Sequence, residues 1–140
     1  MSDTPSHRST GVAARRRRIA ASGALAAVIA AGLLVHTQLP DTALTDIAGD
    51  ALYAAAAYAG IVLLLPRLGP PVVAGIAAAW CVGVELFQLT GLPGLWAQAF
   101  PPVVLLLGTV YDARDLIVYL ATVVVVALVD ALVRGRRAAS

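Results

Sequence analysis

Eight polar side chains interrupt otherwise apolar stretches of the sequence, and together they have the chemistry of an acidic binding site. They are four carboxylic acids, one carboxamide, one guanidinium and two phenols: Asp50, Tyr53, Glu85, Gln88, Asp112, Arg114, Asp115 and Tyr119. Ionised carboxylates accept hydrogen bonds and attract cations, whereas the phenols, the carboxamide and the guanidinium can donate. Because a charge in apolar surroundings is costly unless it is paired, these residues indicate a function or an essential contact.

The spacing of these residues places them on three helix faces. Asp50 and Tyr53 are three residues apart, as are Glu85 and Gln88, so each pair shares one face of a helix. A third stripe follows intervals of three, four and three residues through Asp112, Asp115, Tyr119 and Thr122. If three helices turn these faces inward, they line one acidic cleft.

Simpler structural roles explain part of this set. Asp50 and Asp112 are also suited to capping a helix, and Asp115 in a first turn favours the positive end of the helix dipole. Arg114 can neutralise Asp112 or Asp115, or extend to lipid headgroups. Glu85 is different, because no cap explains a carboxylate this far inside a helix.

The sequence contains no pattern of a familiar catalytic or metal site. It has no nucleotide-binding loop, no nucleophile paired with a base, and no two histidines at metal spacing. The single cysteine, Cys81, has no second thiol to bond and is expected to pack as a small apolar residue. Asp130 and Arg134 are four residues apart and are expected to form a local ion pair. We therefore predict no catalytic residue, no metal ligand and no cofactor.

The composition indicates that membrane-spanning helices carry these residues. Of the 140 residues, 60% are apolar and 13% are charged, whereas soluble domains contain about 45–50% and about 25%. A chain of this length provides about four spans of roughly 20 residues. Within lipid, each span must satisfy its own backbone hydrogen bonds as a helix. We expect an all-α, polytopic integral membrane protein.

Four apolar runs define the expected spans. They lie at about residues 19–36, 48–65, 72–89 and 113–133, which together make a membrane domain over residues 19–133. Residues 1–18 are expected to form a disordered basic tail in the cytoplasm, and residues 134–140 a second basic cytoplasmic tail. A cleaved signal peptide is the alternative for the first span, but no small-x-small cleavage site closes it.

Residues 95–111, between the third and fourth spans, are apolar but interrupted by prolines and a glycine. Their uninterrupted apolar part, residues 103–107, is too short to cross a bilayer. We therefore expect a short re-entrant or interfacial segment, with Trp96 and Phe100 at the headgroup level. The alternative is a short fifth span.

The arginines predict the orientation of the four spans. All ten basic residues are arginines, and an amino terminus in the cytoplasm places nine of them on the inner side: Arg8, Arg15, Arg16, Arg17, Arg18, Arg67, Arg134, Arg136 and Arg137. A fifth span would turn the last three outward. We therefore expect a multi-pass protein of the bacterial inner membrane with both termini in the cytoplasm and the eight polar residues toward the outside. A basic block beside an apolar span requires no nucleic acid partner.

The order and spacing of the polar motifs resemble those of a known family. The motifs are Gly49-Asp50-Ala51-Leu52-Tyr53-Ala54, Glu85-Leu86-Phe87-Gln88-Leu89, Leu107-Gly108-Thr109, and Tyr111-Asp112 followed by Asp115-Leu116 and Tyr119. Over about residues 49–130 they resemble the bacterial membrane family catalogued as domain of unknown function 2809 (DUF2809), and more distantly the VanZ-like superfamily. The resemblance implies a small four-helix inner-membrane protein with Asp50, Glu85, Gln88 and Asp115 as signature positions. It implies no established activity, and glycopeptide resistance is not carried over because the Asp-x-x-x-Asn pattern associated with VanZ is missing.

Three functions fit the sequence. The first is a non-enzymatic cell-envelope protein whose outward-facing acidic cleft binds a lipid headgroup, an envelope precursor or a cation. The alternative is a small proton-coupled transporter, or a transporter subunit, that uses Glu85 and forms a homo-oligomer. The third is an intramembrane enzyme with a carboxylate pair as acid and base or as a metal site, for which the sequence indicates no substrate. A purely structural assembly partner is the remaining alternative. The expected partners are the lipid bilayer and a lipid or cell-envelope ligand.

Overall fold

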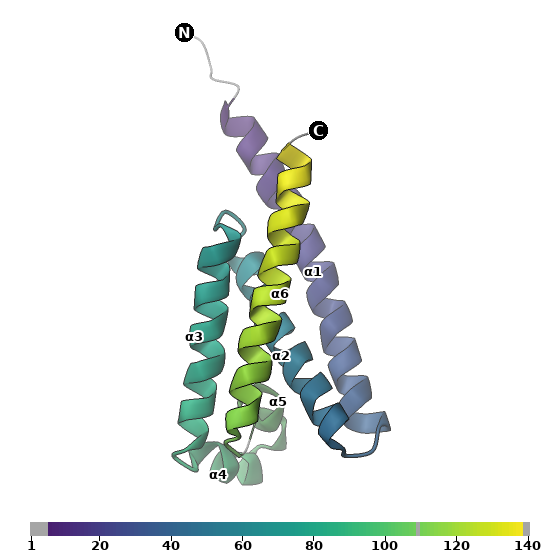
Figure 1. Ribbon diagram of the computed structural model, residues 1–140, viewed down its shortest axis with the longest axis vertical. Helices are drawn as coiled ribbons and strands as arrows, with labels where there is room; N and C mark the ends of the chain where they lie inside the picture. Colours follow the sequence, from purple (N-terminus) through teal and green to yellow (C-terminus); the bar gives the residue numbers. More distant parts are fainter. Residues whose placement is uncertain (1–5, 109, 139–140) are drawn as a thin grey trace.

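The computed structural model describes residues 6–108 and 110–138, and this part of the chain is helical and contains no β-strand. Four long helices, α1 (Ser6–Gln38), α2 (Ala43–Leu64), α3 (Pro70–Gln88) and α6 (Ala113–Ala138), form an up-and-down bundle (Figure 1). Each contains a stretch long and apolar enough to cross a membrane. The predicted all-α, four-span architecture is confirmed, and the chain is a multi-pass membrane protein.

The two ends of the bundle differ in what they contain. We call one the terminal end, because α1 begins there, α6 ends there, and the α2–α3 turn (residues 65–69) lies there (Figure 1). The opposite, loop end contains the α1–α2 turn (residues 39–42) and the segment that joins α3 to α6. The predicted site residues lie toward the loop end.

Caps and prolines set where the inner helices begin. Thr42 and Thr45 form a reciprocal capping box, with hydrogen bonds of 3.3 Å and 2.9 Å between side chain and backbone N–H. This box starts α2 at Ala43, earlier than the predicted 48, because capping does not require an apolar residue. Pro70 begins α3 at a position where a missing N–H costs nothing.

The first and last long helices extend beyond the apolar runs. The sequence predicts a disordered tail over residues 1–18, but α1 already begins at Ser6 and includes the arginines of residues 15–18. Residues 1–5 lie outside the described part of the chain. Arginine and alanine are good helix formers, so the helix of the first span continues through them. For the same reason α6 continues to Ala138, past the predicted end of the last span at residue 133.

The segment between α3 and α6 consists of short helices at the loop end. These are α4 (Leu92–Ala99), the 3₁₀ turn η1 (Pro101–Val103) and α5 (Val104–Leu107). The longest has 8 residues, about 12 Å at 1.5 Å per residue, which is too short to cross a bilayer. Figure 1 shows the segment beneath α3 and α6. The predicted re-entrant or interfacial segment is thereby confirmed over the fifth-span alternative; Thr109, which follows it, lies outside the described residues.

Small side chains form much of the core among α2, α3 and α6. Ala54, Ala77 and Cys81 are buried there together with Tyr58 and Val73. Small residues let helix backbones approach closely, which is how packing holds membrane helices together. α1 packs mainly along α2 and leaves most of its surface exposed.

At the terminal end, Arg17 of α1 joins three elements. Its guanidinium donates to the backbone oxygens of Pro66, at 2.8 Å, and Leu68, and it forms an ion pair with Asp130 of α6. The hydroxyl of Tyr58 also donates to Asp130, at 2.9 Å. The prediction of an ion pair between Asp130 and Arg134 is wrong. Asp130 pairs with Arg17 inside the bundle, whereas Arg134 donates to Leu68 O at 2.9 Å.

Candidate functional site

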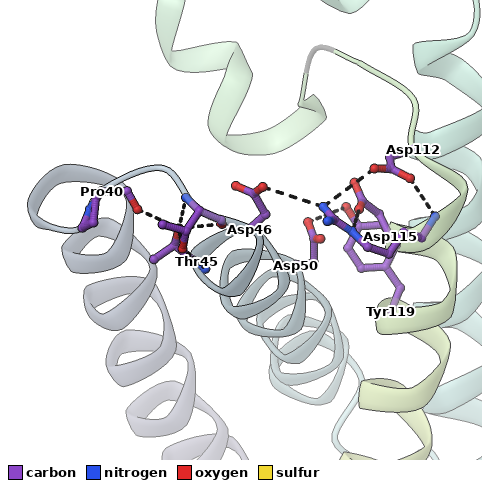
Figure 2. A network of polar contacts seen from close by, with 9 residues as sticks. Pro40, Thr45, Asp46, Asp50, Asp112, Asp115 and Tyr119 are labelled. Atoms are coloured by element: carbon purple, nitrogen blue, oxygen red, sulfur yellow. Dashed lines mark hydrogen bonds and ion pairs between the residues drawn. The ribbon is translucent and has the colours of Figure 1, made fainter.

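Helices α2 and α6 bring most of the predicted site residues together near the loop end. The hydroxyl of Tyr119 donates to Asp50 Oδ1 at 3.4 Å, which joins the two helices directly. Figure 2 shows Asp50, Asp112, Asp115 and Tyr119 gathered between these helices, with Asp46 beside them. The spacing of three and four residues places these side chains on facing sides of α2 and α6, as the sequence predicts.

Arg114 lies among three carboxylates. Its guanidinium is 3.8 Å from Asp46, 3.7 Å from Asp112 and 3.6 Å from Asp115. The sequence predicts the last two neighbours but misses Asp46, which belongs to the same face of α2 as Asp50, four residues away. This interval of four residues places both side chains on one helix face and could have identified Asp46 from the sequence. The early start of α2 brings Asp46 into the helix and onto this face.

Glu85 is fully buried and supports the start of α6. Its Oε2 accepts a hydrogen bond from the backbone N–H of Asp112 at 3.3 Å. The side chain of Asp112 in turn accepts from the backbone N–H of Arg114 at 2.8 Å, which is the geometry of a helix cap. Two N–H groups at the beginning of α6 thus have carboxylate partners, one from Glu85 of α3 and one from Asp112, directly before α6.

Side chains of α2 and α3 hold α5 in place through its backbone oxygens. Tyr53 donates to Leu106 O at 2.7 Å, and Gln88 donates to Leu107 O at 2.8 Å. Trp80 donates to the hydroxyl of Tyr53 at 2.9 Å. The sequence identified Tyr53 and Gln88 but missed Trp80, since a tryptophan inside an apolar run gives no signal of a polar contact.

A cleft of about 1120 Å³ lies against these residues. All predicted site residues line it except Glu85, which lies behind the lining. Three carboxylates, Asp46, Asp50 and Asp115, form its charged part together with Arg114. Apolar residues of α1 and α2, such as Ile29 and Ile61, line the rest. The cleft is therefore amphipathic, with its charged part near the loop end.

Four buried acceptor atoms of the site have no hydrogen-bond partner among the described residues. They are Asp50 Oδ2, Glu85 Oε1, Gln88 Oε1 and Asp115 Oδ1. Buried polar atoms in folded proteins almost always have partners. One donor of the site, Arg114 Nε, is also buried without a hydrogen bond and lies 3.6 Å from Asp115 Oδ1. Acceptors without a hydrogen bond therefore outnumber such donors in the site. Within the described residues, no three His, Cys, Asp or Glu side chains are grouped to hold a metal ion.

Fold and site together define a four-span helical membrane protein with an acidic, amphipathic cleft at one end of the bundle. The chain matches the family described as "Protein of unknown function (DUF2809)" over residues 39–123, so it belongs to that family. The match includes every predicted site residue and begins after α1. Searches of curated proteins and of solved structures find nothing that matches this chain.

Proposed function

We propose that this chain is a non-enzymatic cell-envelope protein whose cleft binds an amphipathic molecule with a primary ammonium group. The headgroup of an aminophospholipid and an amine-bearing, lipid-linked envelope precursor both belong to this class. The ammonium group lies against Asp50 and Asp115, and the apolar part of the ligand lies along α1 and α2.

The surplus of buried acceptors carries this proposal. Asp50, Gln88 and Asp115 line the cleft, and each has one acceptor atom without a hydrogen bond among the described residues, although Asp115 Oδ1 lies 3.6 Å from Arg114 Nε. A primary ammonium supplies three donors and a positive charge, so it satisfies acceptors that a neutral ligand would leave unpaired. A metal ion is the weaker candidate, because the described part of the chain holds no ligand group of three.

Arg114 suits a headgroup that also carries a phosphate. All three of its ion-pair distances are longer than a hydrogen bond, and its side chain is 40% exposed. A guanidinium with free donors binds a phosphate group in a bidentate manner. In the proposed complex, Arg114 binds the phosphate while the neighbouring carboxylates bind the ammonium.

The test compares two lipids that differ only in N-methylation. The protein is reconstituted in nanodiscs that contain phosphatidylethanolamine or phosphatidylcholine with identical acyl chains, and retained lipid is counted by native mass spectrometry. We expect about a tenfold preference for phosphatidylethanolamine, since methylation removes the N–H donors. The double variant Asp50→Asn, Asp115→Asn should lose this preference.

Asp130→Asn is the control, because it removes a carboxylate at the terminal end, away from the cleft; since Asp130 pairs with Arg17, its thermal unfolding is measured alongside to confirm that it is folded. Its preference should equal that of the unchanged protein. Equal retention of the two lipids would overturn the assignment of the headgroup, and retention of neither would overturn binding by the cleft.

We also propose that the protein lies in the bacterial inner membrane with both termini in the cytoplasm. Positive charge is concentrated at the terminal end. Arg67 lies in the α2–α3 turn, and three further arginines donate to this turn or to the end of α2: Arg17, Arg18 and Arg134. Cytoplasmic loops carry such an excess of arginine. The acidic cleft then faces the outside.

Cysteine labelling in intact cells tests this orientation. In a chain with Cys81→Ser, a cysteine at Asp41 in the loop end or at Gly135 in the terminal end is exposed to a membrane-impermeant maleimide. We expect labelling of Asp41→Cys alone. Labelling of Gly135→Cys alone would reverse the orientation.

A second candidate function is proton-coupled transport through Glu85. It is favoured by the full burial of Glu85 within a span and by its Oε1 atom, which has no partner among the described residues. Proteoliposomes with an imposed pH gradient test it, with Glu85→Gln as the inactive control. Uptake of a cationic substrate that Glu85→Gln abolishes supports transport, and equal uptake by both proteins contradicts it. A homo-oligomer and the distant VanZ-like relation remain predictions.

A further inference from the structure

A second pocket lies at the terminal end, at the opposite end of the bundle from the acidic cleft. It has a volume of about 480 Å³ and is lined by Gly11, Ala14, Arg15 and Arg18 of α1, by Leu64 at the end of α2 and by residues 65–68 of the α2–α3 turn. Three arginines, Arg15, Arg18 and Arg67, therefore face one pocket from two separate elements. None of the lining residues is acidic.

The neighbouring acid of this region is already neutralised. Asp130 pairs with Arg17, which also donates to the turn oxygens of Pro66 and Leu68. Arg18 donates to Leu64 O at a long 3.4 Å. Arg15 and Arg67 have no hydrogen-bond or ion-pair partner in the part of the chain that the structure describes. The pocket therefore has an uncompensated positive charge.

The pocket lies at the level where the apolar surface of the bundle ends. The uncharged run of α1 begins at Ile19, directly after Arg18, and the contact of Arg18 with Leu64 O brings the end of α2 to the same level. Leu64 and Leu65, which also line the pocket, have exposed fractions of 71% and 49%. Guanidinium groups and exposed apolar side chains thus lie side by side.

We propose that this pocket binds a phosphate ester through Arg15, Arg18 and Arg67. The planar fork of a guanidinium matches two phosphate oxygens, and two unpaired forks on different elements can hold one phosphate group from two sides. The phosphate comes from the headgroup of an anionic phospholipid, whose chains then contact Leu64 and Leu65, or from a soluble phosphate.

The experiment uses the full chain in phosphatidylcholine nanodiscs that contain phosphatidylglycerol at a fixed fraction, with retained phosphatidylglycerol counted by native mass spectrometry. The double variant Arg15→Gln, Arg67→Gln should retain about tenfold less, because it loses charge-assisted hydrogen bonds. The matched control, Arg16→Gln with Arg136→Gln, removes the same charge from exposed residues outside the pocket and should retain nearly as much as the unchanged protein. Equal losses in the two double variants would overturn the proposal, since a diffuse charge would then explain the binding.

Two further measurements complete the test. Added inorganic phosphate distinguishes the sources: retention that phosphate does not affect assigns the pocket to lipid, and displacement of phosphatidylglycerol by phosphate assigns it to a soluble ester. If the glutamine variant fails to insert, Arg15→Lys with Arg67→Lys keeps the charge but loses the fork. Reduced retention by this variant supports the proposal, and unchanged retention contradicts it.

Discussion

At Gly108 the absence of a side chain leaves room for Gln88. The backbone has φ of +60° there, and an added Cβ would collide with Nε2 of Gln88. That same nitrogen donates to Leu107 O. Conformation, space and a hydrogen bond thus all require glycine directly after α5.

We predict that Gly108→Ala destabilises the protein by about 1–3 kcal/mol, because it strains the backbone and displaces the carboxamide of Gln88. Thermal unfolding in detergent measures the change. Gly75→Ala is the control, since a Cβ at Gly75 meets nothing within 4 Å, and its unfolding temperature should be unchanged or slightly higher. Equal unfolding temperatures for Gly108→Ala and the unchanged protein would contradict the prediction.

The hydrogen bond that Glu85 accepts at the start of α6 can be tested separately from its charge. Glu85→Gln keeps an oxygen that can accept from the N–H of Asp112, whereas Glu85→Ala removes the acceptor and leaves a cavity. We expect Glu85→Ala to lose about 2–4 kcal/mol more stability than Glu85→Gln, measured by thermal unfolding. The same loss in both variants would show that the charge, and not the hydrogen bond, supports α6.

At the scale of elements, the attachment of α5 rests on few contacts. α5 packs against α4 and η1, while Tyr53 and Gln88 reach its backbone oxygens from α2 and α3. A short helix held by two side chains can separate from the bundle without disturbing the long helices.

We predict that Tyr53→Phe increases hydrogen exchange in residues 104–107, because it removes the bond to Leu106 O and the acceptor for Trp80. Loss of one such bond, about 1 kcal/mol, corresponds to roughly fivefold faster local opening. Tyr111→Phe is the control, since it alters a phenol near the same end that has no hydrogen bond within the described residues. Unchanged exchange in Tyr53→Phe would mean that Gln88 alone holds α5.

Local patterns in the sequence predict the elements, and their contacts explain what the sequence misses. Apolar length predicts the four spans, and intervals of three and four residues predict the facing sides of α2 and α6. The partners of Tyr53 and Gln88 are backbone oxygens of α5, which no side-chain pattern reveals. The ion pair of Arg17 with Asp130 joins residues 113 positions apart, so local spacing favours the wrong partner, Arg134.

For the whole molecule, Arg17 is the residue that ties α1 to the remaining bundle at the terminal end. The family match begins after α1, so this attachment joins a helix outside the matched region to the rest of the bundle. We predict that Arg17→Gln lowers stability by roughly 2–4 kcal/mol, because Asp130 loses its cationic partner and the turn oxygens lose their donors. Thermal unfolding measures this, with the exposed Arg16→Gln as control. Similar unfolding temperatures for the two variants would contradict the prediction.

From this attachment, α1 and α6 diverge toward the loop end (Figure 1). Residues of both helices line the cleft there, so the ligand of the proposed complex lies between two membrane-spanning helices and beside the surrounding lipid. A lipid ligand can therefore enter sideways without leaving its leaflet. Its occupancy then depends on its mole fraction in that leaflet and not on an aqueous concentration. Extraction into a large excess of detergent would dilute such a ligand and empty the cleft even when its affinity is unchanged.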